Sequence, residues 1–277
     1  MMFRSGVGAV GASFLVFVLV LSVMAPWVTP YDPLAQDLDH ALQLPSLDHW
    51  LGTDDLGRDL LSRLMLGTRV SVAVGFGSAV LALAIGTGAG MVAGYQAGWL
   101  SATIMRLSDV LLAFPAVLLA MLVATVLKAG ISGVILSIAV VSLPTFARLA
   151  QAVMLEQRHR TYVDAAIAFG ASPGYIIFRA VLPNVLAPLI VQTAFTIANA
   201  VLLEAGLSFL GLGIQPPDPS LGLMLQEARG YVRSDAWFGI CPGVLLILIV
   251  LALNAAADTL GQLADPRGAI RSARAAL

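Results

Sequence analysis

Six stretches of this sequence lack Asp, Glu, Lys and Arg over 18 or more residues, and they constrain the fold more than any other feature. They are 5–31, 70–105, 110–127, 129–147, 180–203 and 236–257. A helix needs about 20 mostly apolar residues to cross a bilayer. The longest stretch is too short for two spans and a turn, so we expect one helix there, over about 70–93. The sequence therefore predicts an all-α membrane protein with about six transmembrane helices.

The composition agrees with a lipid environment. Of 277 residues, 59% are hydrophobic and 11% charged, with a mean hydropathy of +0.91, whereas soluble domains carry about 25% charged residues. The net charge of −1 gives no reason to expect a nucleic-acid partner. The single cysteine, Cys241, excludes a disulfide framework and a multi-cysteine metal site. We expect no metal and no cofactor on this chain.

The sequence lacks the residues that ATP hydrolysis, ion-coupled transport and catalysis within the membrane require. The one lysine, Lys128, does not stand in the Gly-Lys-Ser/Thr sequence of a phosphate-binding loop, so the chain cannot be its own ATPase. We expect Asp109, Glu204 and Asp258 at helix ends, which disfavours an ion-coupled carrier with charges at mid-membrane. All three histidines lie outside the expected spans, which disfavours a membrane-embedded enzyme. A transport role would need energy from another subunit.

The stretch 5–31 could be a cleaved signal peptide, but it is longer than a signal h-region, so we expect a retained first span.

The distribution of basic residues predicts the orientation of the chain in the membrane. With six spans, the two termini share a side with nine arginines, and six basic residues lie opposite, which favours cytoplasmic termini. On the first side are Arg4, Arg106, Arg148, Arg158, Arg160, Arg179, Arg267, Arg271 and Arg274, and on the other are Arg58, Arg63, Arg69, Lys128, Arg229 and Arg233.

This topology divides the chain into three parts. Residues 1–31 form the cytoplasmic N-terminus and first span, 32–69 an external segment, and 70–277 a five-helix core. The core includes a cytoplasmic segment, 148–183, and an external segment, 204–235. Within 32–69 we expect an interfacial helix capped by Thr53, with Leu56, Leu60 and Leu64 on one face and Arg58, Asp59 and Arg63 turned elsewhere. That helix either lies on the membrane or serves recognition or gating.

Two short helices with a break between them are expected in the cytoplasmic segment. Residues 162–169 suit a helix, Gly170 permits a positive φ at its end, and Ser172 with Pro173 starts a second helix. Pro183 is expected to close the segment. Such a pair could merely connect two spans, or its small residues flanked by aromatic side chains could enter a groove on another protein.

The spacing in this segment resembles the EAA loop of binding-protein-dependent ABC importer permeases. That loop reads Glu-Ala-Ala, three residues, Gly, nine residues, then Ile-x-Leu-Pro. This chain has Asp164-Ala165-Ala166, Gly170 and Leu182-Pro183, with Asp164 in place of Glu and Ala180 at the Ile position. Both departures leave the spacing unchanged.

Nearly the full length resembles the C-type permease of the dipeptide, oligopeptide and nickel subfamily. The resemblance rests on the order and spacing of several short stretches. They are Pro30-Tyr31-Asp32-Pro33, His49 to Asp59, Asp109 with Phe114-Pro115, Leu207 to Gly213, and Pro216-Pro217-x-Pro219-Ser220-x-Gly222.

The resemblance implies a type I ABC importer permease fold and a non-catalytic subunit that forms half of a translocation pathway for di- or oligopeptides or related solutes. It implies ATPase coupling by Tyr162, Asp164, Ala165, Ala166, Gly170, Ser172, Pro173, Leu182 and Pro183. It implies an external gate that includes Glu204, Ser208, Phe209, Gly211 and Gly213.

The resemblance also implies partners. These are a second permease in a heterodimer, two ATPase subunits that bind ATP and Mg, an extracytoplasmic substrate-binding protein and membrane lipid. The location would be a bacterial or archaeal cytoplasmic membrane. Dipeptide, oligopeptide, nickel-chelate, glutathione and opine transport all remain open. A channel or secondary carrier is the rival reading, and it leaves the Asp164–Pro183 segment unexplained.

Overall fold

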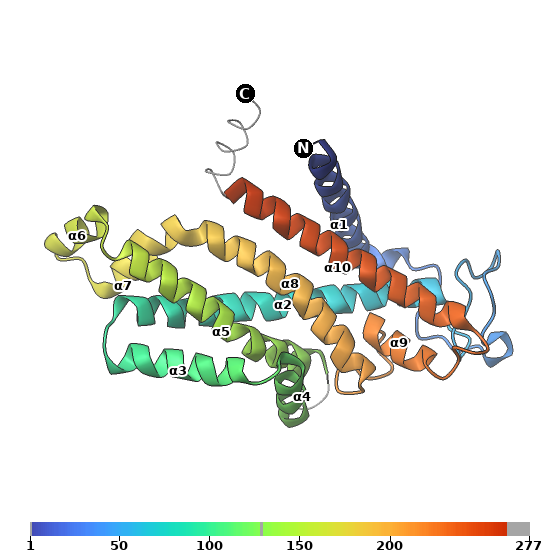
Figure 1. Cartoon of the computed structure of the whole chain (residues 1–277). Helices are drawn as coiled ribbons and strands as arrows, with labels where there is room; N and C mark the ends of the chain where they lie inside the picture. Colours follow the sequence, from blue (N-terminus) through green and yellow to red (C-terminus); the bar gives the residue numbers. More distant parts are fainter. Residues whose placement is uncertain (1, 128–129, 265–277) are drawn as a thin grey trace.

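The computed structural model describes residues 2–127 and 130–264, so Lys128, Arg267, Arg271 and Arg274 lie outside the described residues. Within that part the chain is helical, and the one β-bridge joins Thr53 to Asp59. The helices of a full turn or more are α1 (Met2–Val28), α2 (Leu60–Tyr95), α3 (Trp99–Ala113), α4 (Ala116–Leu127), α5 (Ile131–Gln157), α6 (Thr161–Ala168), α8 (Leu186–Phe209), α9 (Leu221–Ala228) and α10 (Ala236–Ala264). Figure 1 shows α6 at one end of the bundle and α9 at the other.

Four helical segments are each long and apolar enough to cross a membrane: Leu60–Tyr95, Ile131–Gln157, Pro173–Phe209 and Ala236–Leu263. The bent pair α3 and α4 makes a fifth if it counts as one span. The apolar part of α1, Ser13–Val28, is shorter. The all-α membrane fold is confirmed, and the count of six stays a prediction.

Helices α2 and α5 run parallel and pack unusually closely, as the glycine series in α2 favours. A β-carbon at Gly86 would lie 2.6 Å from the Leu143 carbonyl oxygen, and one at Gly94 would lie 2.6 Å from Cβ of Met154. Between them, a β-carbon at Gly90 would overlap the carbonyl of Ala147. The three glycines therefore let the two backbones meet.

The expected third span, 110–127, is broken at Phe114-Pro115. The two helices α3 and α4 meet there at 101°, because a proline disfavours the helical conformation of the residue before it. Phe114 is extended, with φ −84° and ψ 139°. Helix α3 begins at Trp99 and ends at Ala113, so Asp109 lies about one turn before the C-terminal end of α3 and not at the start of a span.

The expected interfacial helix over 53–64 is also wrong. Residues 53–59 form turns, and α2 starts at Leu60, where the Asp59 side chain accepts a hydrogen bond from the Ser62 N–H. Thr53 caps no helix, since its hydroxyl accepts from the backbone N–H of Gln43. The span predicted over 70–93 therefore begins ten residues earlier, and Arg58, Asp59 and Arg63 are buried.

The chain stays helical through Pro183, where we expected the cytoplasmic segment to close. A short turn at Pro173–Tyr175 runs into a π-helical stretch, Ile176–Val181, then a 3-10 turn, Leu182–Val185, and then α8. Proline lacks a backbone N–H, but in the first turn of a helix that N–H would have no partner, so proline is tolerated there. The helix therefore continues past Pro183 with a changed pitch. The result is one apolar helical segment over Pro173–Phe209.

Candidate functional site

Helix α6 stands at the end of the bundle and presents most of its surface to solvent. Its one buried side chain is Val163, which belongs to the same core cluster as Ile176 and Met154. Asp164 and Ala165 are exposed, and Ala166 is half-buried. Tyr162 donates a 3.0 Å hydrogen bond to Gln157 at the end of α5. One apolar anchor thus holds a helix whose remaining faces are free.

The turn after α6 has the predicted geometry. Gly170 has φ +77°, and its N–H donates to the Ile167 carbonyl at 2.9 Å while the Ala171 N–H donates to Ala166 at 3.0 Å. These bonds satisfy the last carbonyls of α6. Ser172 then accepts a hydrogen bond from the Tyr175 N–H, with Pro173 at the first helical position. The predicted cap residues are therefore confirmed as local structure.

Large apolar side chains surround this turn. Phe169 is 92% exposed, and Ile167 and Tyr175 are each about half exposed. Leu182 is half-buried and Pro183 exposed. An isolated chain gains nothing by exposing a phenylalanine at an ordered turn, so this surface has the character of a protein-binding site.

At the opposite end, Glu204 is fully buried where α2 and α8 meet. Ser71 of α2 donates a 2.6 Å hydrogen bond to one carboxylate oxygen, and Ser208 donates a 2.8 Å bond to the other. The Ser208 hydroxyl also accepts from the Ile214 N–H at 3.0 Å. Gly213 packs on Ser208 so closely that a β-carbon would overlap it. Glu204 and Ser208 therefore fix the loop that follows α8.

The other predicted gate residues lie further out in the same loop. Phe209 is 39% exposed, and Gly211 has φ +78°, which favours glycine. Beyond the loop, Ser220 caps α9 by accepting from the Leu223 N–H. Gly222 allows α9 to lie directly on Ala205 of α8. Of this predicted set, the structure brings Glu204, Ser208 and Gly213 together and leaves Phe209 outward.

A buried ion network, missed by the sequence reading, lies at the same end. Arg58 contacts Asp54 at 2.6 Å, and Arg63 contacts Asp54 at 3.1 Å and Glu227 of α9 at 2.8 Å. The side chains of Arg63 and Asp54 are completely buried. Burial raises the pKa of Glu227, and the two arginines oppose that shift. The network joins the segment before α2 to α9.

Three carboxylates of this network, Asp54, Asp55 and Glu227, lie close enough to share an ion. Burial, followed by the charge of Asp54, raises the pKa of Asp55. Arg58 and Arg63 already reach these carboxylates from within the cluster. The arrangement is therefore an internal ion-pair network, and it gives no reason to place a metal there.

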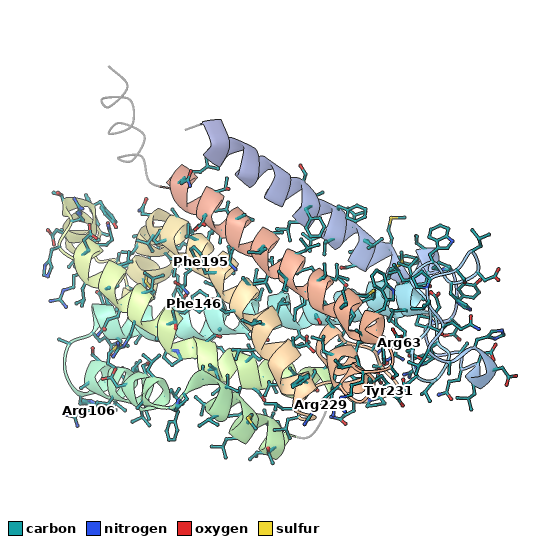
Figure 2. All side chains as sticks on the ribbon, turned by 45° about the vertical axis from the view of Figure 1, so that its right-hand side comes forward. Arg63, Arg106, Phe146, Phe195, Arg229 and Tyr231 are labelled. Atoms are coloured by element: carbon teal, nitrogen blue, oxygen red, sulfur yellow. The ribbon has the colours of Figure 1, made fainter. Side chains whose placement is uncertain are left out.

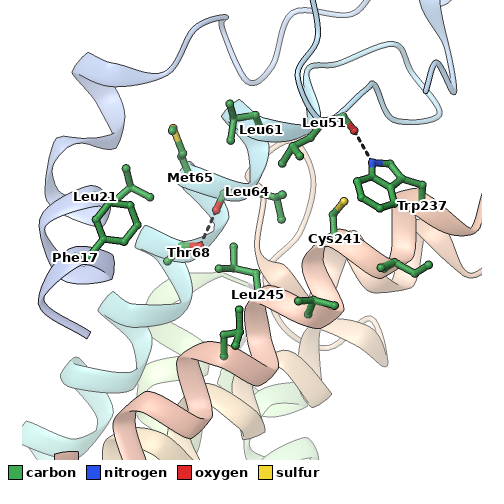
Figure 3. Close-up of a pocket in the computed structure, with 13 residues that line it drawn as sticks. Phe17, Leu21, Leu51, Leu61, Leu64, Met65, Thr68, Trp237, Cys241 and Leu245 are labelled. Carbon is green, nitrogen blue, oxygen red and sulfur yellow. Dashed lines mark hydrogen bonds between the residues drawn. The ribbon is translucent and has the colours of Figure 1, made fainter. Parts of the chain in front are cut away.

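Helices α1, α2 and α10 border an open cavity of about 550 Å³ (Figure 3). Its lining is almost entirely hydrocarbon, including Phe17, Leu64 and Leu245. The two polar groups beside it are already bonded, since Thr68 donates to the Leu64 carbonyl and Trp237 to the Leu51 carbonyl. Nothing in this cavity could bind the charged ends of a peptide.

A bundle of long apolar helices that carries an ordered, exposed helix-turn-helix at one end is a multi-pass membrane protein of the transporter permease class. The family model described as "Binding-protein-dependent transport system inner membrane component" matches residues 86–269. A second, "N-terminal TM domain of oligopeptide transport permease C", matches residues 2–45. The chain therefore belongs to this family of ABC importer permeases, and within it to the dipeptide/oligopeptide type.

Relatives match over nearly the whole chain. The dipeptide transport system permease protein of Haemophilus influenzae is 41% identical over 96% of this chain and 92% of its own length. The di/tripeptide permease protein of Pseudomonas aeruginosa is also 41% identical, over 96% and 90%. A glutathione transport system permease protein of Pectobacterium atrosepticum is 38% identical over 95% and 88%.

A solved structure confirms the fold. The inward-facing MetNI methionine ABC transporter has a chain that superposes with a TM-score of 0.61, covering 74% of this chain and 98% of its own. At 21% sequence identity, this match supports the architecture and nothing finer about solutes.

Proposed function

We propose that this permease subunit imports short peptides, or solutes of similar size and polarity, and is driven by separate ATPase subunits bound at α6. Its relatives are named as transporters of dipeptides, of di- and tripeptides and of glutathione, which are all short peptides. We propose further that it pairs with a second, different permease chain and receives solute from an extracytoplasmic binding protein. ATP and Mg would be held by the ATPases.

The exposed surface of α6 and its turn is the observation that carries the coupling proposal. Asp164, Ala165 and Phe169 lie on a short helix tied to the bundle mainly through Val163. A cleft that closes around this helix would move it as a unit, and Val163 would pass that motion to the core beside α5. ATP can shift the transport cycle only if the ATPases bind this helix differently in their open and closed states.

The same proposal assigns the two ends of the bundle. The end with α6 would be cytoplasmic, in a bacterial or archaeal cytoplasmic membrane, and the end with α9 external. Both termini of the chain would be on the cytoplasmic side. Phe209 and Gly211 would border the external gate, whereas the buried Glu204 and Ser208 would hold the gate loop in place. A solute would then meet backbone and Phe209 and would not meet the carboxylate.

Purification of the complex tests the coupling surface. Phe169→Glu should abolish recovery of the ATPase subunits with the tagged permease in mild detergent. Leu44→Glu is the matched control, because Leu44 is also highly exposed, at 67%, but lies near the opposite end of the bundle. Full recovery of ATPases with Phe169→Glu would refute the assignment, and so would a wild-type permease that purifies without any nucleotide-binding subunit.

A further inference from the structure

The outward surface of α3 is divided into two stripes. One stripe consists of small and charged residues, and the other is mostly apolar. The first comprises Ala102, Arg106, Asp109 and Ala113, all exposed, with the exposed Leu112 on one flank. The second comprises Thr103, Leu107 and Val110, with Phe114 directly after the helix, also exposed. Figure 2 shows Arg106 on α3 at the outer surface of the bundle. The helix is thus amphipathic although its buried face, marked by Ser108, already packs inside the protein.

An ion pair joins the polar stripe to the neighbouring helix. Arg148 of α5 contacts the carboxylate of Asp109, and the two side chains are 56% and 54% exposed. Both residues lie within helices. At 1.5 Å per residue, Asp109 is about 15 Å from the start of α3 at Trp99, and Arg148 is about 14 Å from the end of α5 at Gln157.

These two helix ends lie at the same end of the bundle. Helices α2 and α5 run parallel, as the contacts of Gly86, Gly90 and Gly94 require, and α3 starts four residues after α2 ends. The ion pair is therefore about 15 Å inside that end of the bundle.

Exposure of these two charged side chains is costly wherever lipid hydrocarbon is the surrounding medium. A charged side chain at mid-bilayer costs about 2.5–3.5 kcal/mol even on the lowest scale, and such residues normally face a bundle interior or water. Pairing compensates only part of the desolvation of two charges. A lipid-facing helix would also have no use for a separate polar stripe.

We propose that the polar stripe of α3, with Arg148 of α5, lines a water-filled pathway through the assembled transporter, and that the apolar stripe does not. The identity of the moving solute rests on the proposed function above, but the hydration of this surface does not. A carboxylate and a guanidinium side by side would offer partners to a solute that carries both charges, as a peptide with free ends does.

Cysteine accessibility tests the proposal in the whole transporter, in open membrane fragments that expose both sides. Cys241, the single native cysteine, is first replaced by alanine. Ala113→Cys on the polar stripe is compared with its matched control, Val110→Cys on the apolar stripe, since both are small changes one turn apart. Asp109→Cys and Leu107→Cys form a second pair. The probe is a charged, membrane-impermeant methanethiosulfonate.

We expect the cysteines at 109 and 113 to react at least about ten times faster than those at 107 and 110, because only thiols in contact with water ionise and react with such a reagent. Equal rates on the two stripes, a reversed order, or no reaction at 113 would overturn the proposal. Peptide uptake by the Cys241→Ala transporter is measured separately. If the cysteines of the polar stripe react faster but the transporter takes up no peptide, the proposed water-filled pathway is supported and the proposed peptide function is refuted.

Discussion

Ser71 of α2 donates a 2.6 Å hydrogen bond to the carboxylate of Glu204 on α8, although the two residues are 133 positions apart and both are fully buried. With Ser208 on the other oxygen, this bond fixes where α8 ends and the following loop begins. Hydrogen bonds between buried side chains therefore hold the start of this loop in place.

Glu204→Ala should destabilise the permease by about 1–3 kcal/mol, because it strands the buried hydroxyls of Ser71 and Ser208. The measurement is the fraction of detergent-solubilised permease that stays monodisperse after heating. Glu156→Ala is the control, since Glu156 is 65% exposed and pairs with Arg160 on the surface. Equal heat resistance of the two variants would show that the buried network contributes no stability.

Gly90→Ala should lower the heat resistance of the permease, with a cost of about 1–3 kcal/mol from overpacking against Ala147. Gly88→Ala in the same helix is the matched control, because no atom lies within 4 Å of a β-carbon there. The control should be neutral or slightly stabilising, since alanine favours helix over glycine by about 1 kcal/mol. A Gly90→Ala variant as heat-resistant as its control would contradict the close contact between α2 and α5.

Arg63→Gln should cost about 3–5 kcal/mol, because it removes one of the two guanidinium groups that pair with the buried Asp54 and the partly buried Glu227. Proteolysis in open membrane fragments that expose both sides measures the effect, as faster cleavage around α9. Arg69→Gln, at an exposed position of the same helix, should change nothing. Unaltered cleavage in Arg63→Gln would mean that the network does not hold α9.

Gly170→Val should impair transport while the helices stay inserted, because a β-branched residue at φ +77° carries a strain of about 1–3 kcal/mol and will shift the turn after α6. Solute uptake and ATP hydrolysis are both measured in reconstituted transporter. Gly174→Val is the control, since a β-carbon there meets open space and its φ is not positive. Normal uptake by Gly170→Val would argue against a role of this turn in coupling.

The sequence predicted best what depends on local chemistry. The long apolar stretches, the turn at Gly170 and the cap at Ser172 follow from residue types read over a few positions, and the glycine series of α2 indicated close packing. The expected helix over 53–64 failed because Asp54, Arg58 and Arg63 form ion pairs with one another and with Glu227, a partner more than 160 residues away. No local sequence pattern predicts an ion pair between residues so far apart in the chain.

The polar groups of α3 were missed for a related reason. Counting residues between charges treats a charge as the end of a span, so Asp109 was placed at a boundary when it in fact lies inside a helix. The Phe114-Pro115 pair was the available signal for the break, because a residue before proline tends to leave the helix. The partner of Asp109, Arg148, becomes visible only when α3 and α5 lie side by side.

Helix α2 is a single uninterrupted rod of 36 residues, about 54 Å long. Asp59 and the ion network hold its first turn, the closely packed glycines hold its last third against α5, and it ends near the base of α6. A helix of this kind cannot shorten, so it can carry a displacement from the α6 end to the α9 end. Helix α2 thus acts as a rigid rod between the two ends of the bundle.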